Sequence, residues 1–152
     1  MEPTFTVSGR IAKPVHEVYE AVADPAILSR YFTTGGAQGR METGATVTWD
    51  FHDFPGQFPV HVVTAQQDKR IEFRWGAAEG AAKEGETETT VVFTFTSLED
   101  GRTLVEIVEK GFSDSDAGWN AALNQCGGWT AMLCAMRVWL EHGINLREGF
   151  YV

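Results

Sequence analysis

Two ionisable side chains in strand-like segments, Glu109 and His61, are best suited to move a proton or orient a ligand. Glu109 ends the run Thr103–Glu109, in which each face of a strand would carry two aliphatic side chains and one glutamate. Periodicity therefore leaves two readings open. An inward Glu109 would be a hydrogen-bond acceptor or a general base with a raised pKa, and an outward one a solvated carboxylate or an ion-pair partner. His61 stands in a valine-rich run, where acid–base work and an exposed or locally bonded ring are the alternatives.

The sequence lacks the patterns of metal-dependent, phosphate-binding or covalent catalysis. The four histidines are scattered and no Cys-x₂-Cys occurs, so we expect no metal site and no cofactor. No glycine-rich phosphate loop has a strand–turn–helix context, and no serine stands in a nucleophile elbow. Cys126 and Cys134 have no basic neighbour in sequence that would activate a thiolate. A covalent enzyme is therefore disfavoured.

Aromatic residues recur on one face of several strand-like segments and could wall a pocket. Buried rings usually only fill a core, which is the alternative for each of them. A pocket walled by aromatic side chains with few polar groups is the usual form of a small-molecule site. Together with residues of the last helical segment, the expected lining is Trp49, Phe51, Phe73, Trp75, Phe93, Phe95, Trp119, Leu123 and Trp129.

One long helical pattern, from about Asp114 to His142, would form the other wall of such a pocket. Its apolar residues recur at spacings of three and four, which indicates one helix face against an apolar surface. That face consists of Trp119, Ala122, Cys126, Trp129, Leu133, Met136 and Leu140. Asn120 and Gln125 flank it, and each would either bond a ligand or face solvent.

The middle of this helical segment is made of small residues. Gly127 and Gly128 each cost about 1 kcal/mol relative to alanine in a helix interior. Their presence suggests a bend, a close approach of the sheet or clearance for a ligand. Cys126 and Cys134 lie on the same helix, with backbones roughly 12 Å apart, too far for a disulfide. We expect two buried free thiols, which fits a reducing compartment.

The elements before this helix are short and mostly strand-like. Pro14 can open a helix that ends at Ala23, and Asp24-Pro25 starts a second one through Phe32. Thr33–Thr43 is expected to be irregular and Gly76–Gly85 a loop. The expected strands are Thr4–Ile11, Ala45–Phe51, Phe58–Ala65, Ile71–Trp75, Thr87–Thr96 and Thr103–Glu109, with a turn at Asp53–Gly56. We therefore expect one α+β domain over residues 1–152, with an antiparallel sheet covered on one face.

The overall charge restricts the partners. A formal net charge of −9 disfavours nucleic acid and an anionic membrane surface, because both need a basic face. No apolar run approaches the length of a membrane-spanning helix, and the start of the sequence does not resemble a secretion signal. The expected location is the cytoplasm.

Several motifs, in order, carry a resemblance to a known family. They are Ile11–Val22, Asp24-Pro25, Leu28–Phe32, Lys69–Trp75, Thr89–Thr96, Gly111-Phe112 and Gly128-Trp129. This set resembles the START-like (SRPBCC, Bet v 1-like helix-grip) proteins, and most of all the branch named after the activator of Hsp90 ATPase. Each motif is weak alone, whereas the ordered set covers nearly the whole chain.

The resemblance implies a helix-grip fold, in which a curved six-stranded antiparallel sheet wraps around the C-terminal helix and leaves a hydrophobic cavity. Two short helices would follow the first strand. It also favours inward-pointing Val105 and Ile107, which would bring Glu109 to the cavity mouth. The family includes small-ligand binders, polyketide cyclases and aromatases, and co-chaperone domains.

Three functions follow as hypotheses. The first is binding of a small hydrophobic molecule, aromatic or lipid-like, with Glu109, His61 or Asn120 fixing its orientation. The second is a non-covalent enzyme of the cyclase or aromatase kind, which needs an inward carboxylate or imidazole. The third is a protein-interaction module of the co-chaperone type, with a filled core and an exposed apolar patch. The apolar segment Gly143–Val152 is expected to dock on its own domain or on a second copy, so a homodimer is one outcome.

Overall fold

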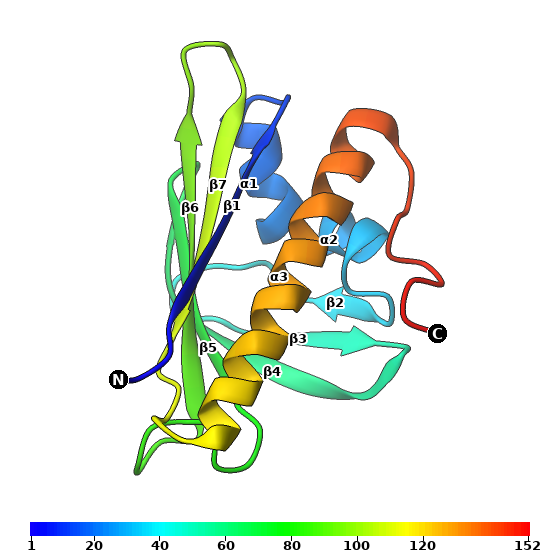
Figure 1. Ribbon diagram of the computed structural model, residues 1–152. Helices are drawn as coiled ribbons and strands as arrows, with labels where there is room; N and C mark the ends of the chain where they lie inside the picture. The colour runs from blue at the N-terminus through cyan, green and yellow to red at the C-terminus, as the bar shows by residue number, and fades with distance from the viewer.

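The computed structural model describes residues 1–152, except for the side chain of Pro55 (Figure 1). A first strand and two short helices are followed by six strands and the long helix. The elements are β1 (Phe5–Ile11), α1 (Val15–Ala23), α2 (Pro25–Tyr31), β2 (Gly36–Gln38), β3 (Thr46–Phe51), β4 (Phe54–Gln66), β5 (Arg70–Gly76), β6 (Glu88–Ser97), β7 (Thr103–Lys110) and α3 (Asp116–His142). The order of elements and the α+β class are as predicted.

The strands form one antiparallel sheet of seven strands in the order β1-β7-β6-β5-β4-β3-β2. The prediction of six strands was short by one, because Gly36–Gln38 was expected to be irregular and instead pairs with β3. A second correction concerns the turn expected at Asp53–Gly56. The turn lies at His52 and Asp53 instead, because Phe51 already pairs with Phe54, where β4 begins. Because Asp53–Gly56 is composed of turn-forming residues, the sequence did not indicate that β4 begins among them.

Local sequence signals account for the ends of the helices. The Asp24 side chain accepts a hydrogen bond from the amide of Ala26, and Pro25 begins α2. The hydroxyl of Ser115 accepts from the amide of Gly118 at the start of α3, and Gly143 ends that helix in a left-handed conformation with φ of 68°. Serine and aspartate at a helix start and glycine just past its end satisfy backbone groups that the helix leaves unpaired.

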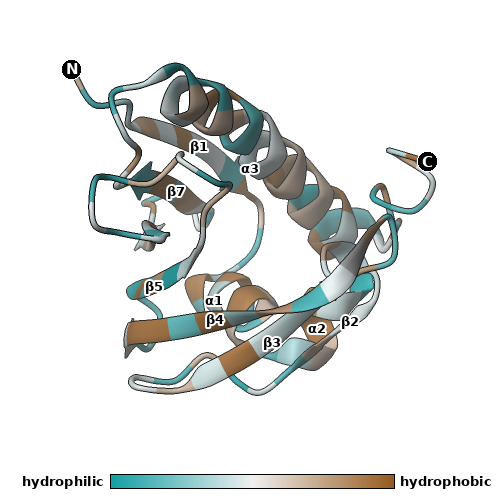
Figure 2. Cartoon of the chain, turned by 90° about the horizontal axis from the view of Figure 1, so that it is seen from below, coloured by the Kyte–Doolittle hydropathy of each residue, from teal (hydrophilic) through white to brown (hydrophobic). Residues whose placement is uncertain are grey.

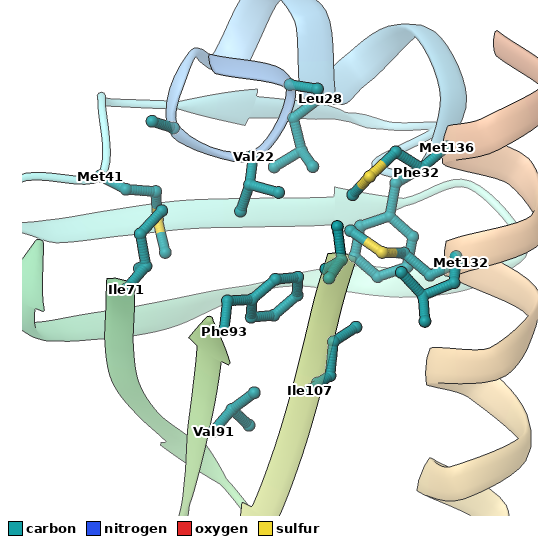
Figure 3. Packing of buried hydrophobic residues seen from close by; sticks show 14 of the residues in the cluster. Val22, Leu28, Phe32, Met41, Ile71, Val91, Phe93, Ile107, Met132 and Met136 are labelled. Atoms are coloured by element: carbon teal, nitrogen blue, oxygen red, sulfur yellow. The ribbon is translucent and has the colours of Figure 1, made fainter. Parts of the chain in front are cut away.

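The core lies between the concave face of the sheet, the two short helices and the second half of α3. In Figure 3, Met132 and Met136 reach from α3 toward Phe32, and Phe93 and Ile107 lie on neighbouring strands below them. Val105, Ile107 and Glu109 all point to this face, as the resemblance implied. The first half of α3 is packed far less closely, and this difference produces the candidate site.

The apolar stripe predicted along all of α3 is therefore correct only in part. From Trp129 onward its members are buried or pack against the core, whereas Trp119 is 42% exposed. The cysteines also differ from expectation, since Cys134 is exposed and Cys126 is only half-buried. Both thiols are free, as predicted. Among the described residues, no helix is long and apolar enough to cross a membrane.

Candidate functional site

An open groove lies between the first half of α3 and the strands opposite it. Figure 2, which views the molecule from below, shows α3 on one side and β3 and β4 on the other. The groove has a volume of about 1580 Å³. Nine aromatic residues line it: Phe32, Phe51, Phe54, Phe58, Trp75, Phe112, Trp129, Phe150 and Tyr151. Because pockets for drug-sized ligands measure roughly 300–1,000 Å³, this groove has room for a ligand and solvent together.

The helix side of the groove is shaped by small residues. Ala121, Gly127 and Gly128 line it, and a Cβ atom added at either glycine would meet no atom within 4 Å. The helix also continues without interruption through both positions. A close approach of the sheet is therefore wrong as an explanation of these glycines. A bend and clearance for a ligand stay predictions, and the open space beside both glycines favours clearance.

A carboxylate cluster lies directly behind the groove wall. Glu109 is 0% exposed, and its Oε1 accepts hydrogen bonds from Nε1 of Trp75 at 2.8 Å and from the hydroxyl of Thr89 at 3.0 Å. Its Oε2 accepts from Nε1 of Trp129 at 3.1 Å. Trp75, Thr89 and Trp129 all line the groove, so Glu109 is separated from it by one hydrogen-bonded group.

Burial governs the protonation of Glu109. Removal from water raises the pKa of this carboxyl, and the hydrogen bonds from Trp75, Trp129, Thr89 and Gln125 oppose that rise without cancelling it. Glu109 forms no ion pair with any described residue. The cluster thus holds two indole rings in place at the base of the groove by means of a carboxylate that no cation neutralises.

The residues predicted to line a cavity fall into three groups. Phe51, His61, Trp75, Leu123 and Trp129 line the groove. Trp49, Phe73, Phe93 and Phe95 belong to the filled core. Trp119 and Asn120 are exposed outside the groove lining, and Nε1 of Trp119 donates to Asp114.

The cavity expected over Phe73 and Phe93 is therefore filled. Trp129 occupies that space, with its ring centroid 5.4 Å from that of Phe93 and 6.2 Å from that of Phe73. The open space lies next to it instead, beside Trp75, whose ring centroid is 5.3 Å from that of Trp129. The spacing of apolar residues in α3 could not indicate that Trp129 fills this space, because one helix face borders both the core and the groove.

His61 lies at the edge of the groove, with half of its side chain exposed. Its Nδ1 is 3.1 Å from the hydroxyl of Thr46, and its Nε2 is 3.4 Å from a carboxylate oxygen of Glu88. These neighbours fit the local-bonding alternative more closely than an active acid–base group, since neither connects the imidazole to Glu109.

Sequence reasoning missed the far end of the groove. The guanidinium of Arg147 forms two hydrogen bonds with Asp53, at 2.5 and 3.1 Å, and both side chains are almost fully buried. The same guanidinium lies over Phe51 and Tyr151, 5.5 and 4.5 Å from the ring centroids. Burial tends to raise the pKa of Asp53, but Arg147 lowers it overall. The expected docking of Gly143–Val152 on its own domain occurs through this pair.

The chemistry of the site is thus apolar and aromatic, with a few polar groups. Within the part of the chain that the structure describes, no three His, Cys, Asp or Glu side chains lie close enough together to hold a metal ion. Thr89 was also missed, because nothing in the alternation of β6 separates it from other threonines. Gln125, which the sequence placed beside the stripe, lines the groove and acts on the pKa of Glu109.

The sequence was compared with protein families and with curated proteins. A family described as Activator of Hsp90 ATPase homolog 1-like protein matches residues 12–141. Comparison with curated proteins gave no match.

Solved structures share the fold along nearly the whole chain. A Staphylococcus saprophyticus protein, SSP2350, is 25% identical with a TM-score of 0.78, and the alignment covers 95% of this chain and 96% of that one. DynU16, a protein of the dynemicin biosynthetic locus, is 26% identical with a TM-score of 0.75, and the alignment covers 94% of this chain but only 49% of DynU16. The Aha1 dimer of Colwellia psychrerythraea is 18% identical with a TM-score of 0.73, with 93% and 98% covered.

Proposed function

We propose that this chain, which belongs to the family of activator of Hsp90 ATPase homolog 1-like proteins, binds a small hydrophobic molecule in the groove between α3 and the sheet. The observation that carries the proposal is the groove itself, with its nine aromatic residues and its glycine-lined helix wall. Apolar surface removed from water contributes about 25 cal/mol per Å², so a flat aromatic or lipid-like body would supply most of the affinity.

Polar groups around the groove would orient such a ligand. His61 and Gln125 line the groove and can donate or accept hydrogen bonds, while Glu109 acts from behind through Trp75 and Trp129. Asn120, which was expected to share this role, is exposed outside the groove lining. The ends of the groove that could open are the segment after α3, which supplies Phe150 and Tyr151, and the chain after β5, which supplies Ala77 and Ala78.

Binding of the neutral fluorophore N-phenylnaphthylamine tests this proposal. We expect a saturable fluorescence increase with quenching of tryptophan emission. Gly128→Leu should weaken it at least about tenfold by filling the groove, since a tenfold loss corresponds to about 1.4 kcal/mol. Cys134→Leu, on the exposed side of the same helix, is the matched control and should bind as the unchanged protein does. Binding that does not saturate, or that survives Gly128→Leu unchanged, would overturn the proposal; it would favour an exposed apolar surface of the interaction-module kind.

An enzyme of the cyclase or aromatase kind is the second candidate, and one observation favours it. Glu109 has a raised pKa and lies next to the groove, as a general base for such chemistry would. Its two oxygens are already occupied by hydrogen bonds and it is fully buried, which favours ligand binding without catalysis. Turnover of a polyketide-type substrate that is lost in Glu109→Gln, with ligand binding retained, would reverse this order.

We further propose a cytoplasmic location and a homodimer. Two free cysteines support the first, because reducing compartments preserve thiols. Exposed Ile144, Leu146 and Phe150 after α3 support the second. A family relative from Colwellia psychrerythraea is described as a dimer in solution. Sedimentation equilibrium distinguishes the outcomes, and the mass of a single chain at high concentration would exclude the homodimer.

A further inference from the structure

The charge around the groove is unbalanced at Glu109. The two basic residues adjacent in register, Lys110 and Arg74, belong to the opposite face of the sheet, because side chains alternate along each strand. Arg74 forms an ion pair with Glu86 on that face. The groups packed against Glu109 from β5, β6 and α3 are Trp75, Thr89, Trp129 and Gln125, and none of them carries a charge.

The hydrogen bonds suit the ionised form of Glu109. An indole N–H can only donate, and each carboxylate oxygen accepts one such donor. A protonated carboxyl would have to turn one oxygen into a donor, for which only the hydroxyl of Thr89 or the amide oxygen of Gln125 could accept. A buried carboxylate held in this way is costly unless a positive charge lies nearby. The described residues do not supply that positive charge. The groove, on the far side of Trp75 and Trp129, is the open space next to the cluster.

The walls of the groove are also of the kind that attracts cations. The faces of tryptophan, tyrosine and phenylalanine rings attract an ammonium or guanidinium group. The chain already uses this attraction at the far end, where the guanidinium of Arg147 lies over Phe51 and Tyr151. Asp53 neutralises that guanidinium, so it offers no charge to a ligand.

Glu88 and His61 lie at the edge of the groove, and alternation along β4 and β6 places both side chains on the face of the sheet that carries Arg74. Glu88 lies 3.4 Å from His61 and 3.9 Å from Arg74, so it is partly balanced. The carboxyl of Glu109 lies behind the groove wall without a cationic partner among the described residues, and Arg147 in the groove lining is already paired with Asp53. The groove therefore combines aromatic walls with a negative charge.

We propose that the molecule bound in the groove is an organic cation: a hydrophobic, preferably aromatic, body that carries one ammonium or amidinium group near Trp75 and Trp129. This inference rests on the proposed ligand-binding function and specifies the class of ligand. Glu109 acts in it as a positioning residue, since it orients both indoles and supplies the balancing charge from behind them.

Three naphthalene probes of matched shape test the assignment. They are trimethyl(naphthylmethyl)ammonium, its uncharged isostere neopentylnaphthalene, and the anion naphthylacetate, each followed by tryptophan quenching. The ammonium probe should bind about tenfold more tightly than its neutral isostere, and the anion least tightly. If none of the three binds, the proposed function itself fails. If the neutral probe or the anion binds as tightly as the cation, only the charge assignment is overturned.

The role of Glu109 is tested by the same pair of probes in Glu109→Gln. The preference for the cation over its isostere should fall to about twofold or less, because the substitution removes the negative charge behind the two indoles. Should this variant not fold, the native protein is titrated from neutral pH to the acid limit of its folded state, with a parallel series in Glu88→Gln to separate the other carboxylate at the edge of the groove. The quaternary ammonium does not titrate, so a preference that declines with acid in both series supports the role. A preference that persists in folded Glu109→Gln, or that is constant with pH, would overturn it.

Discussion

At the residue scale, the central feature is a carboxylate that stabilises two aromatic side chains instead of meeting a basic one. Oε1 and Oε2 of Glu109 are each held by an indole N–H, from Trp75 on β5 and Trp129 on α3. These bonds fix the angle at which the two rings form the base of the groove. The site is thus assembled by hydrogen bonds to one buried carboxyl group, and its stability should depend on that group.

The first prediction concerns Glu109→Gln. The amide of glutamine would place a donor where Oε2 now accepts from Trp129, so one buried N–H would lose its partner. An unsatisfied buried donor costs about 1–3 kcal/mol, and we expect a loss of unfolding free energy of that size in urea titrations. Glu106→Gln, an outward-facing position of the same strand, is the control and should change stability by less than about 0.5 kcal/mol. Equal effects of the two substitutions would contradict the account.

The second prediction concerns pH. Because burial raises the pKa of Glu109 in the folded protein, the folded state binds more protons than the unfolded state between the two pKa values. The contribution of Glu109 to stability is therefore largest below its ordinary pKa and is lost as the pH rises through the raised one. We expect the difference in unfolding free energy between the native protein and Glu109→Gln to decrease over that interval and then level off. A difference that grows with rising pH would show the opposite shift.

At the scale of elements, the two halves of the continuous helix α3 have different surroundings. Its second half packs into the core through Met132, Leu133 and Met136, and its first half borders the groove with glycine and small side chains. The sequence of α3 does not indicate this division, because apolar residues recur at spacings of three and four in both halves. The glycines in the middle mark the point where the packing changes.

The third prediction compares two kinds of glycine in this helix. Gly127→Ala should raise the unfolding free energy by about 1 kcal/mol, since a Cβ there meets no atom within 4 Å and alanine favours helix. Gly118→Ala should lower it, because its Cβ would lie 1.9 Å from the carbonyl oxygen of Ser113 and must displace backbone. Chemical denaturation of both variants measures these changes in unfolding free energy. A loss of stability in Gly127→Ala would indicate a neighbour that the groove does not contain in this structure.

At the scale of the whole molecule, the segment after α3 closes the structure against the β3–β4 turn. Asp53 and Arg147 are far apart in sequence, and their paired, nearly buried charges join the last residues to the rim of the groove. Phe150 and Tyr151 are thereby placed along the groove while more than a third of each side chain stays exposed. This segment is held by one strong contact and few others.

The fourth prediction follows from that contact. Asp53→Asn leaves the guanidinium of Arg147 without a charged partner, so residues 143–152 should detach more readily. Trypsin should then cleave after Arg147 at least about tenfold faster, because removing one partner of a buried pair costs about 3–5 kcal/mol and a tenfold change corresponds to only about 1.4 kcal/mol. Glu84→Gln, at an exposed position in the loop before β6, is the control. The pKa of Asp53 is lowered, so the native anchor should be intact at neutral pH and be lost on acidification. An unchanged cleavage rate in Asp53→Asn would contradict the anchoring role.

The amino-acid sequence by itself determined the order of the elements, the antiparallel sheet and the family, because alternation, helical spacing and capping residues are local signals. Thus β1, β7 and the ends of α2 and α3 follow from neighbours within a few residues. It also singled out Glu109, Trp75 and Trp129, but not their relation.

Only the tertiary structure decided where the open space lies and what surrounds Glu109. Its three hydrogen-bond donors come from positions 20 to 34 residues away on different elements, and Asp53 and Arg147 are 94 residues apart. Whether a ring on the shared face fills the core, as Trp129 does over Phe93, depends on packing volumes that periodicity does not contain.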